Sequence, residues 1–164
     1  LDNISEEELA GMLYENSDEP YCEELAKAIT DEIRRGNRID TTTKLRNVIE
    51  KTLDFLPNNK EKKDIIKKTC QRTFQALRID VNNEFEVLYE FMEKLPGALK
   101  PGGRVAILTF HSGEDKLVKK ALKAGYKEGI YSEYARDVVR PSAQECAQNG
   151  RARSTKMRWA VKAE

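Results

Sequence analysis

One short segment, LKPGGRVAILTFHSGED at residues 99–115, constrains the fold of this chain more than any other. After a Pro-Gly-Gly turn, residues 105–108 form a continuous apolar run, which is typical of a strand buried on both faces of a parallel sheet. From Gly113 onward the apolar residues recur at helical spacing. The segment therefore predicts a strand, a short polar loop and a helix.

The polar loop of this unit carries His111 and Ser112. In open α/β sheets, ligands bind beyond the carboxyl ends of strands, where the next helix also presents its positive N-terminus. For His111 a role in binding or proton transfer and a structural hydrogen-bonding role both remain open. Ser112 and Asp115 form a Ser-x-x-Asp pair, which favours a helix cap. No His or Cys is spaced to join His111 in a metal site, so we expect no metal.

The first half of the chain is predicted to be helical. Ser5 and Glu8 fit a capping box that opens the first helix. A second helix begins near Pro20, which suits a first turn, and Thr41 or Thr42 caps a third. This half of the chain is therefore expected to consist mainly of helices.

A long amphipathic helix is predicted from Arg72 to about Lys94, because apolar residues recur there at intervals of three and four. Its polar side carries Gln75, Arg78 and Asn82 in one row. This row is either an ordinary solvated face or a surface that contacts a ligand or a neighbouring domain.

The charge balance and the cysteines bear on the binding partners and the location of the protein. The chain has 29 Lys and Arg against 28 Asp and Glu, so any attraction to nucleic acid must come from local segregation of charge. Arg151 and Arg153 form one such local cluster, although an ordinary basic turn explains them equally simply. The three cysteines form no CxxC pair, which favours reduced thiols and a cytoplasmic location. No apolar run approaches the ~20 residues of a membrane span.

Three motifs, in order along the chain, resemble the bacterial 16S ribosomal RNA cytosine-N4 methyltransferases. They are RTFQALRIDVNNE at residues 72–84, LKPGGRVAILTFHSGED at residues 99–115, and RPSAQECAQNGRARSTKMR at residues 140–158. The segment EELAKAITDEIRRGN, residues 23–37, is also similar to that family, so the resemblance covers the chain almost from end to end.

The resemblance implies an α/β fold that is helix-rich overall. Residues 1 to about 70 would form most of a helical insertion domain on the substrate side. Residues 71–164 would contribute the long helix and the carboxyl-terminal part of a Rossmann-like methyltransferase sheet, with only its last strands present and residues 158–162 as the final one. The complete enzyme would bind S-adenosylmethionine.

The resemblance also implies a substrate and a set of site residues. The target would be the exocyclic amine of a cytosine in the small ribosomal subunit, a poor nucleophile that must be held in line with the methyl group while its proton is accepted. His111 and Ser112 are the candidate catalytic residues. The candidates for substrate or RNA binding are Arg72, Gln75, Arg78, Asn82, Arg151, Arg153 and Ser154.

The half of the family that binds the methyl donor has no counterpart in these residues. A glycine-rich loop after a strand, an acidic residue at the end of a second strand and the family's Asp-Leu-Gly-x-Ser-Ser motif are all missing. We therefore identify no cofactor-binding residue and expect no donor binding by this chain alone. A smaller departure is Gly113, where the family carries a bulkier Leu.

Three hypotheses follow from the resemblance and this departure. The chain is the carboxyl-terminal part of an rRNA methyltransferase, whose amino-terminal half lies on the same gene or on a partner chain. Alternatively, it is a non-catalytic RNA-binding or assembly module derived from that family. A third hypothesis is a subunit that completes the sheet of a partner or pairs with itself as a homodimer. No membrane association is expected.

Overall fold

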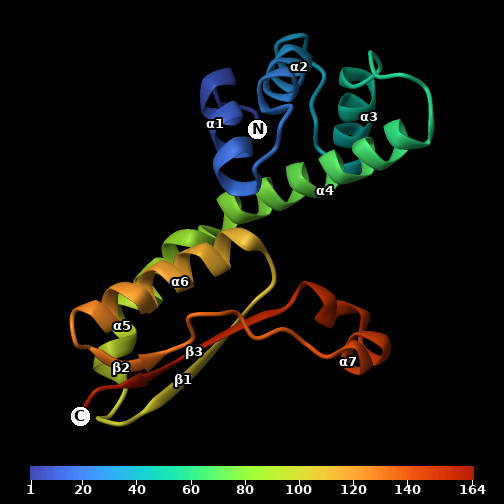
Figure 1. Ribbon diagram of the computed structural model, residues 1–164. Coiled ribbons are helices and arrows are strands. Elements are labelled where there is room, and N and C mark those ends of the chain that lie inside the picture. Colours follow the sequence, from blue (N-terminus) through green and yellow to red (C-terminus); the bar gives the residue numbers. More distant parts are fainter. The chain divides into compact units, whose positions relative to one another are not determined.

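The computed structural model describes all 164 residues and divides into two compact units, Leu1–Asn83 and Glu84–Glu164. The first unit is entirely helical, and the second combines helices with a small sheet (Figure 1). None of the helices is both long enough and apolar enough to span a membrane. The α/β, helix-rich fold class is therefore confirmed, whereas the domain boundary near residue 70 stays a prediction.

In the first unit, two helices pack against a long fourth helix, and another packs against these two. They are α1 (Glu6–Ser17), α2 (Cys22–Arg34), α3 (Thr42–Thr52) and α4 (Lys60–Asn82). The predicted capping box of Ser5 and Glu8 is confirmed, and Thr41 caps α3 by accepting from the Lys44 amide. The core contains six fully buried aliphatic side chains, Leu9, Leu13, Leu25, Ile29, Ile49 and Leu53. Burial of these side chains holds the unit together.

The single long helix predicted from Arg72 to Lys94 is wrong. The chain forms α4 and then a separate helix, α5 (Glu84–Ala98), with Asn83 between them in the left-handed conformation at φ 50° and ψ 40°. Asparagine tolerates this conformation better than most residues. The apolar spacing continues across the junction, so the periodicity alone did not reveal the break.

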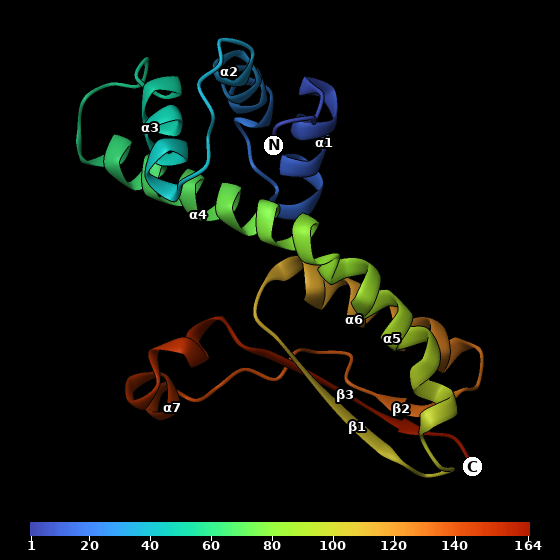
Figure 2. The ribbon, with the colours of Figure 1, turned by 180° about the vertical axis from the view of Figure 1, so that it is seen from behind.

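The second unit is built on a three-stranded sheet with the order β1–β3–β2. After α5 come β1 (Arg104–Thr109), α6 (Ser112–Lys127), β2 (Tyr131–Tyr134), α7 (Ala143–Gln148), a 3-10 turn (Gly150–Ser154) and β3 (Lys156–Lys162). Seen from behind, β3 runs between the other two strands (Figure 2). The core consists of Met92 and Leu95 from α5, Val118 and Leu122 from α6, and Tyr131 and Ala160 from the sheet. One face of the sheet is thus covered by α5 and α6.

The parallel, doubly buried strand predicted at residues 105–108 is only partly correct. The strand exists, but it pairs antiparallel with β3, with Val105 opposite Ala160, and it lies at the edge of the sheet. Leu108 is 57% exposed and Phe110 is 56% exposed. An apolar run indicates a tendency to be buried on both faces but carries no information on the direction of pairing. The final strand also begins at Lys156 rather than at Arg158.

Candidate functional site at the start of helix α6

The connection from β1 to α6 consists of two residues, Phe110 and His111. His111 is the N-cap of α6, because its backbone is extended at φ −138° and its Nδ1 accepts a hydrogen bond from the Glu114 amide at 3.4 Å. The Glu114 carboxylate in turn accepts from the Phe110 amide at 3.0 Å. This reciprocal arrangement resembles a capping box. The prediction that Ser112 caps the helix is wrong, because Ser112 is the first helical residue.

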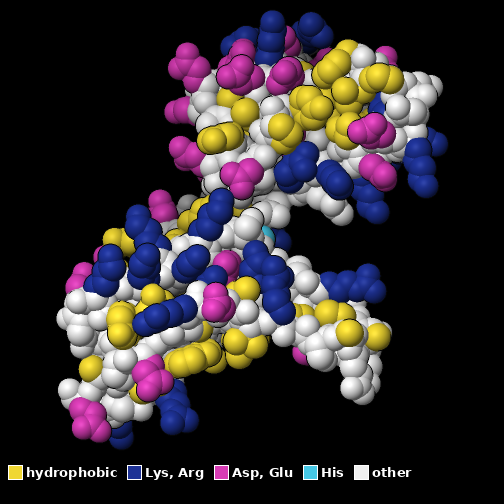
Figure 3. Space-filling view, in the orientation of Figure 1, with side chains coloured by type: hydrophobic (Ala, Val, Ile, Leu, Met, Phe, Trp, Pro, Cys, Tyr) yellow, Lys and Arg dark blue, Asp and Glu magenta, His cyan; other side chains and the backbone are white.

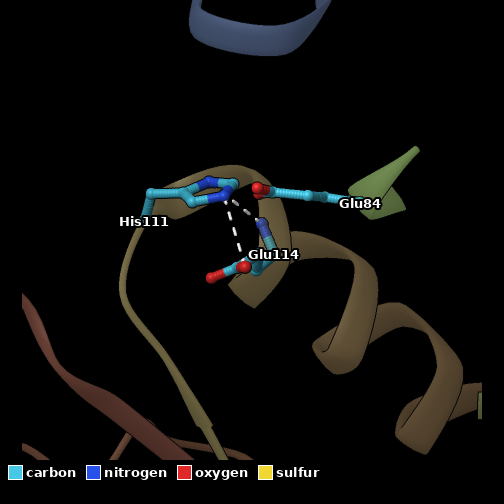
Figure 4. A group of neighbouring side chains, drawn as sticks. All are labelled: Glu84, His111 and Glu114. Atoms are coloured by element: carbon cyan, nitrogen blue, oxygen red, sulfur yellow. Dashed lines mark hydrogen bonds and ion pairs between the residues drawn. The ribbon is translucent and has the colours of Figure 1, made fainter. Parts of the chain in front are cut away.

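Glu84, the first residue of α5, brings a second carboxylate to His111 (Figure 4). Ligand atoms of Glu84, His111 and Glu114 all lie within 4.8 Å of one another. Nε2 of His111 is 3.4 Å from Oε1 of Glu114, and the imidazole is only 11% exposed. Since Nδ1 accepts from the Glu114 amide, this network assigns the proton of the neutral ring to Nε2, on the side of the carboxylates.

A histidine and two carboxylates also suit a divalent cation. Coordination through Nε2 of His111 would move the ring proton to Nδ1, which would then no longer accept from the Glu114 amide. The helix cap and a metal at Nε2 therefore compete, and hydrogen bonding is the simpler role for this cluster. Sequence reasoning missed Glu84 because it is far from His111 along the chain.

Gly113 is explained by close packing on this cluster. The ring of Phe85 lies edge-on to the His111 ring, with centroids 5.7 Å apart and an interplanar angle of 67°. A Cβ atom on Gly113 would lie 2.7 Å from Cζ of Phe85, which is closer than real Cβ atoms come. A leucine at this position would require Phe85 to move.

Asp115 on α6 forms a nearly buried ion pair with Arg158 on β3. The Asp115 carboxylate accepts from Nε of Arg158 at 2.7 Å and from its Nη2 at 3.1 Å. Nη1 of Arg158 donates to the carbonyls of Ala135 and Arg136, and the residue is 5% exposed. The hydrogen bond from Arg158 holds the pKa of Asp115 below its ordinary value. This pair fixes the first turn of α6 to the middle strand of the sheet.

The predicted substrate row lies on α4, in the first unit. Arg72 already has a structural partner, since its Nε donates to the fully buried carboxylate of Glu19 at 2.6 Å. Asn82 donates to the Arg78 carbonyl at 3.0 Å, and Gln75 is half-buried. This row and His111 belong to different compact units, so their shared function stays a prediction.

Arg151, Arg153 and Ser154 lie in the 3-10 turn between α7 and β3. All three are exposed, and the Ser154 hydroxyl donates to the Arg151 carbonyl at 3.4 Å. The turn is opened by the Asn149 side chain, which accepts from the Arg151 amide at 3.1 Å. Both guanidinium groups are therefore accessible to an anionic partner, and their contact with RNA stays a prediction.

The comparisons with known proteins identify the family. A sequence profile described as the MraW methylase family matches residues 1–163. The chain belongs to the MraW methylase family. It is 89% identical over 164 residues to "Ribosomal RNA small subunit methyltransferase H 1" of Agathobacter rectalis, a match that covers the whole chain and 47% of the relative. The resemblance seen in the three motifs is thereby confirmed.

More distant MraW relatives show the same pattern of coverage. The protein named "Ribosomal RNA small subunit methyltransferase H 1" in Lachnoclostridium phytofermentans is 70% identical over 163 residues, which cover 99% of the chain and 44% of the relative. "Ribosomal RNA small subunit methyltransferase H" of Rickettsia prowazekii is 35% identical over 179 residues, covering 99% of the chain and 56% of the relative. The chain thus spans about half the length of these relatives.

The MraW family depends on S-adenosylmethionine, but the residues of this chain do not by themselves fit that group. Donor sites of α/β folds use a glycine-rich turn after a strand, where backbone amides approach the ligand. Here Gly102, at φ 71°, and Gly103 lie in the turn before β1. After β1, the amides of Phe110 and Glu114 are already used by the cap.

Proposed function

We propose that this chain is the carboxyl-terminal part of an S-adenosylmethionine-dependent enzyme that methylates N4 of a cytosine in 16S rRNA. It would act only together with the amino-terminal half that holds the donor. The observation that supports this proposal is the incomplete sheet of the second unit, in a chain that spans about half the length of its methyltransferase relatives.

The open edge and open face of the sheet are suited to the missing half. β1 pairs on one side only, so its other side presents unpaired backbone groups that favour addition of a further strand. The other face of the sheet exposes apolar side chains, among them Leu108, which is 57% exposed, and Phe110 just after β1 is 56% exposed. A hollow of about 480 Å³ on the sheet is lined in part by Ala106, Trp159 and Val161. Burial of this surface would stabilise the complete sheet.

The proposed roles of the site residues follow from their positions. His111 and Ser112 would face the target cytosine at the start of α6, where the fixed helix end holds the imidazole in one orientation. Because the Nε2 proton lies on the side of the two carboxylates, His111 would have to release this contact before Nε2 could act on the substrate. The row on α4 and the exposed Arg151 and Arg153 would contact the RNA around the target.

Complementation between two polypeptides tests this proposal. The amino-terminal part of the Agathobacter rectalis relative, ending where the match to this chain begins, would be produced separately and mixed with this chain. Transfer of labelled methyl groups to small ribosomal subunits is expected from the mixture and from neither part alone. Calorimetric titration is expected to show no donor binding by this chain by itself. Tight donor binding by this chain, or a mixture without activity, would contradict the proposal.

A non-catalytic RNA-binding module is the second candidate function. The exposed guanidinium groups of Arg151 and Arg153, which form no ion pair within the structure, favour this alternative. It predicts that the chain binds small-subunit RNA with a steep dependence on salt, whereas the complemented mixture transfers no methyl group. The third hypothesis, a homodimer, is tested by size-exclusion chromatography. Elution of the chain as a monomer would count against it.

A further inference from the structure

Helix α6 carries a row of five lysines on one side. Lys116, Lys119, Lys120, Lys123 and Lys127 are all exposed. At 3.6 residues per turn, their spacing places them within an arc of about 100°. The acidic residues of α6, Glu114 and Asp115, and its C-cap residue Glu128 fall outside this arc. Dark-blue side chains gather over α6 in the space-filling view (Figure 3).

Four of the five lysines have no acidic partner, unlike several other cations of the chain. Lys119, Lys120, Lys123 and Lys127 form no ion pair, whereas elsewhere Lys44 pairs with Asp40, Arg46 with Glu50, and Lys94 with Glu90. The acidic residue that faces the row from α5 is Glu93, which lines a shared groove with Lys116 and Lys120. Glu93 accepts a hydrogen bond from the Tyr89 hydroxyl.

The fold itself does not account for this row. Like charges three and four residues apart on a helix repel one another, and Asp115, four residues before Lys119, is the only acidic residue spaced to offset this repulsion. The helix dipole favours cations only in the last turn, which includes Lys127 but neither Lys119 nor Lys120. A row of exposed lysines, four of them without an ion pair, is typical of a surface that binds an anionic partner.

We propose that the α6 lysine row contacts the phosphate backbone of the RNA substrate, an inference that rests on the proposed function. From Lys116 to Lys127 the row is about 17 Å long, at 1.5 Å per residue, and reaches several phosphates. Lysine is a flexible point charge that suits backbone contacts, which position an RNA without reading its sequence. The apolar side of α6 is buried in the core at Val118 and Leu122, so the helix has no free apolar face to insert into a membrane.

Filter binding of the full chain to a small-subunit rRNA fragment, over a series of salt concentrations, tests this inference. The triple variant Lys119→Gln, Lys120→Gln, Lys123→Gln removes three phosphate contacts. We expect its affinity at low salt to fall at least tenfold. The slope of log affinity against log salt should become shallower by about 2 to 3, at 0.7 to 0.9 per contact.

The matched control is Lys27→Gln, Lys51→Gln, Lys60→Gln. These three lysines of the first unit are exposed and form no ion pair, so the change in net charge is the same. The control is expected to bind RNA within twofold of the unmodified chain, and thermal melting establishes that both variants are folded.

An equal loss in both variants would show an effect of net charge and overturn the inference. Unchanged binding by the α6 variant would also overturn it, as would equally tight binding of polyglutamate, which would indicate an acidic protein partner. None of these results affects complementation of methyl transfer, so a failure of this inference is distinguishable from a failure of the proposed function.

Discussion

Removing the carboxylate of Asp115 is expected to destabilise the second unit strongly. The substitution Asp115→Asn leaves the guanidinium of Arg158, a residue only 5% exposed, without its charged partner. Breaking a buried pair from one side costs about 3–5 kcal/mol. The Asp115 side chain is 14% exposed and Arg158 keeps two carbonyl acceptors, so we expect a loss near the lower end, about 3 kcal/mol.

Urea unfolding followed by tryptophan fluorescence measures this loss. Trp159 is the only tryptophan and lies on β3 next to Arg158, so its signal reports the second unit. The double variant Asp115→Leu, Arg158→Met is expected to recover most of the stability, because it removes both charges and leaves apolar groups. The matched control, Glu90→Gln, breaks the exposed pair with Lys94 and should leave the urea midpoint unchanged.

A loss below about 1 kcal/mol in Asp115→Asn would refute this reasoning, since that is the range of a surface ion pair. A double variant as unstable as the single one would refute it as well, because the cost would then not come from an uncompensated charge on Arg158.

Three further predictions concern the same unit. Arg158 lowers the pKa of Asp115 from 3.8, so the pair stabilises the folded state above that pH, and this stabilisation is lost as the pH falls through the lowered pKa. The stability of Asp115→Asn, followed by acid unfolding, should therefore lack this pH-dependent loss. Gly113→Ala would press its Cβ against Phe85 and cost about 1–3 kcal/mol by the same urea assay, and Phe85→Leu should relieve part of this loss. Leu108→Lys, at a position 57% exposed, should leave the urea midpoint unchanged but abolish co-elution with the separately produced amino-terminal half; the first-unit control Val81→Lys should still co-elute.

Local signals in the sequence predicted the elements that local interactions decide. The capping box at Ser5 and the cap at Thr41 were correct because an N-cap side chain bonds to amides only three residues away. The strand after the Pro-Gly-Gly turn was correct in position. The break at Asn83 was missed, because a single left-handed residue interrupts the helix without disturbing the apolar spacing on either side.

The candidate site was predicted only in part. His111 was placed correctly at the end of a strand, but Ser112 and Asp115 were assigned as a cap, whereas Asp115 instead pairs with Arg158. Alternation along the last strand, which places Arg158 on the same side as the buried Ala160, is the signal that could have indicated an inward-facing arginine. Nothing in the spacing indicated that Glu84 lies beside His111.

The sequence by itself determined the family, the caps of the first and third helices and the position of strand β1, because motifs and caps are properties of neighbouring residues. Only the tertiary structure decided which side chains meet across the chain. The approach of Glu84 to His111 and the Arg158–Asp115 pair depend on how helices pack on the sheet. The open edge of β1 depends on strand pairing. Such contacts between distant residues leave no trace in local spacing.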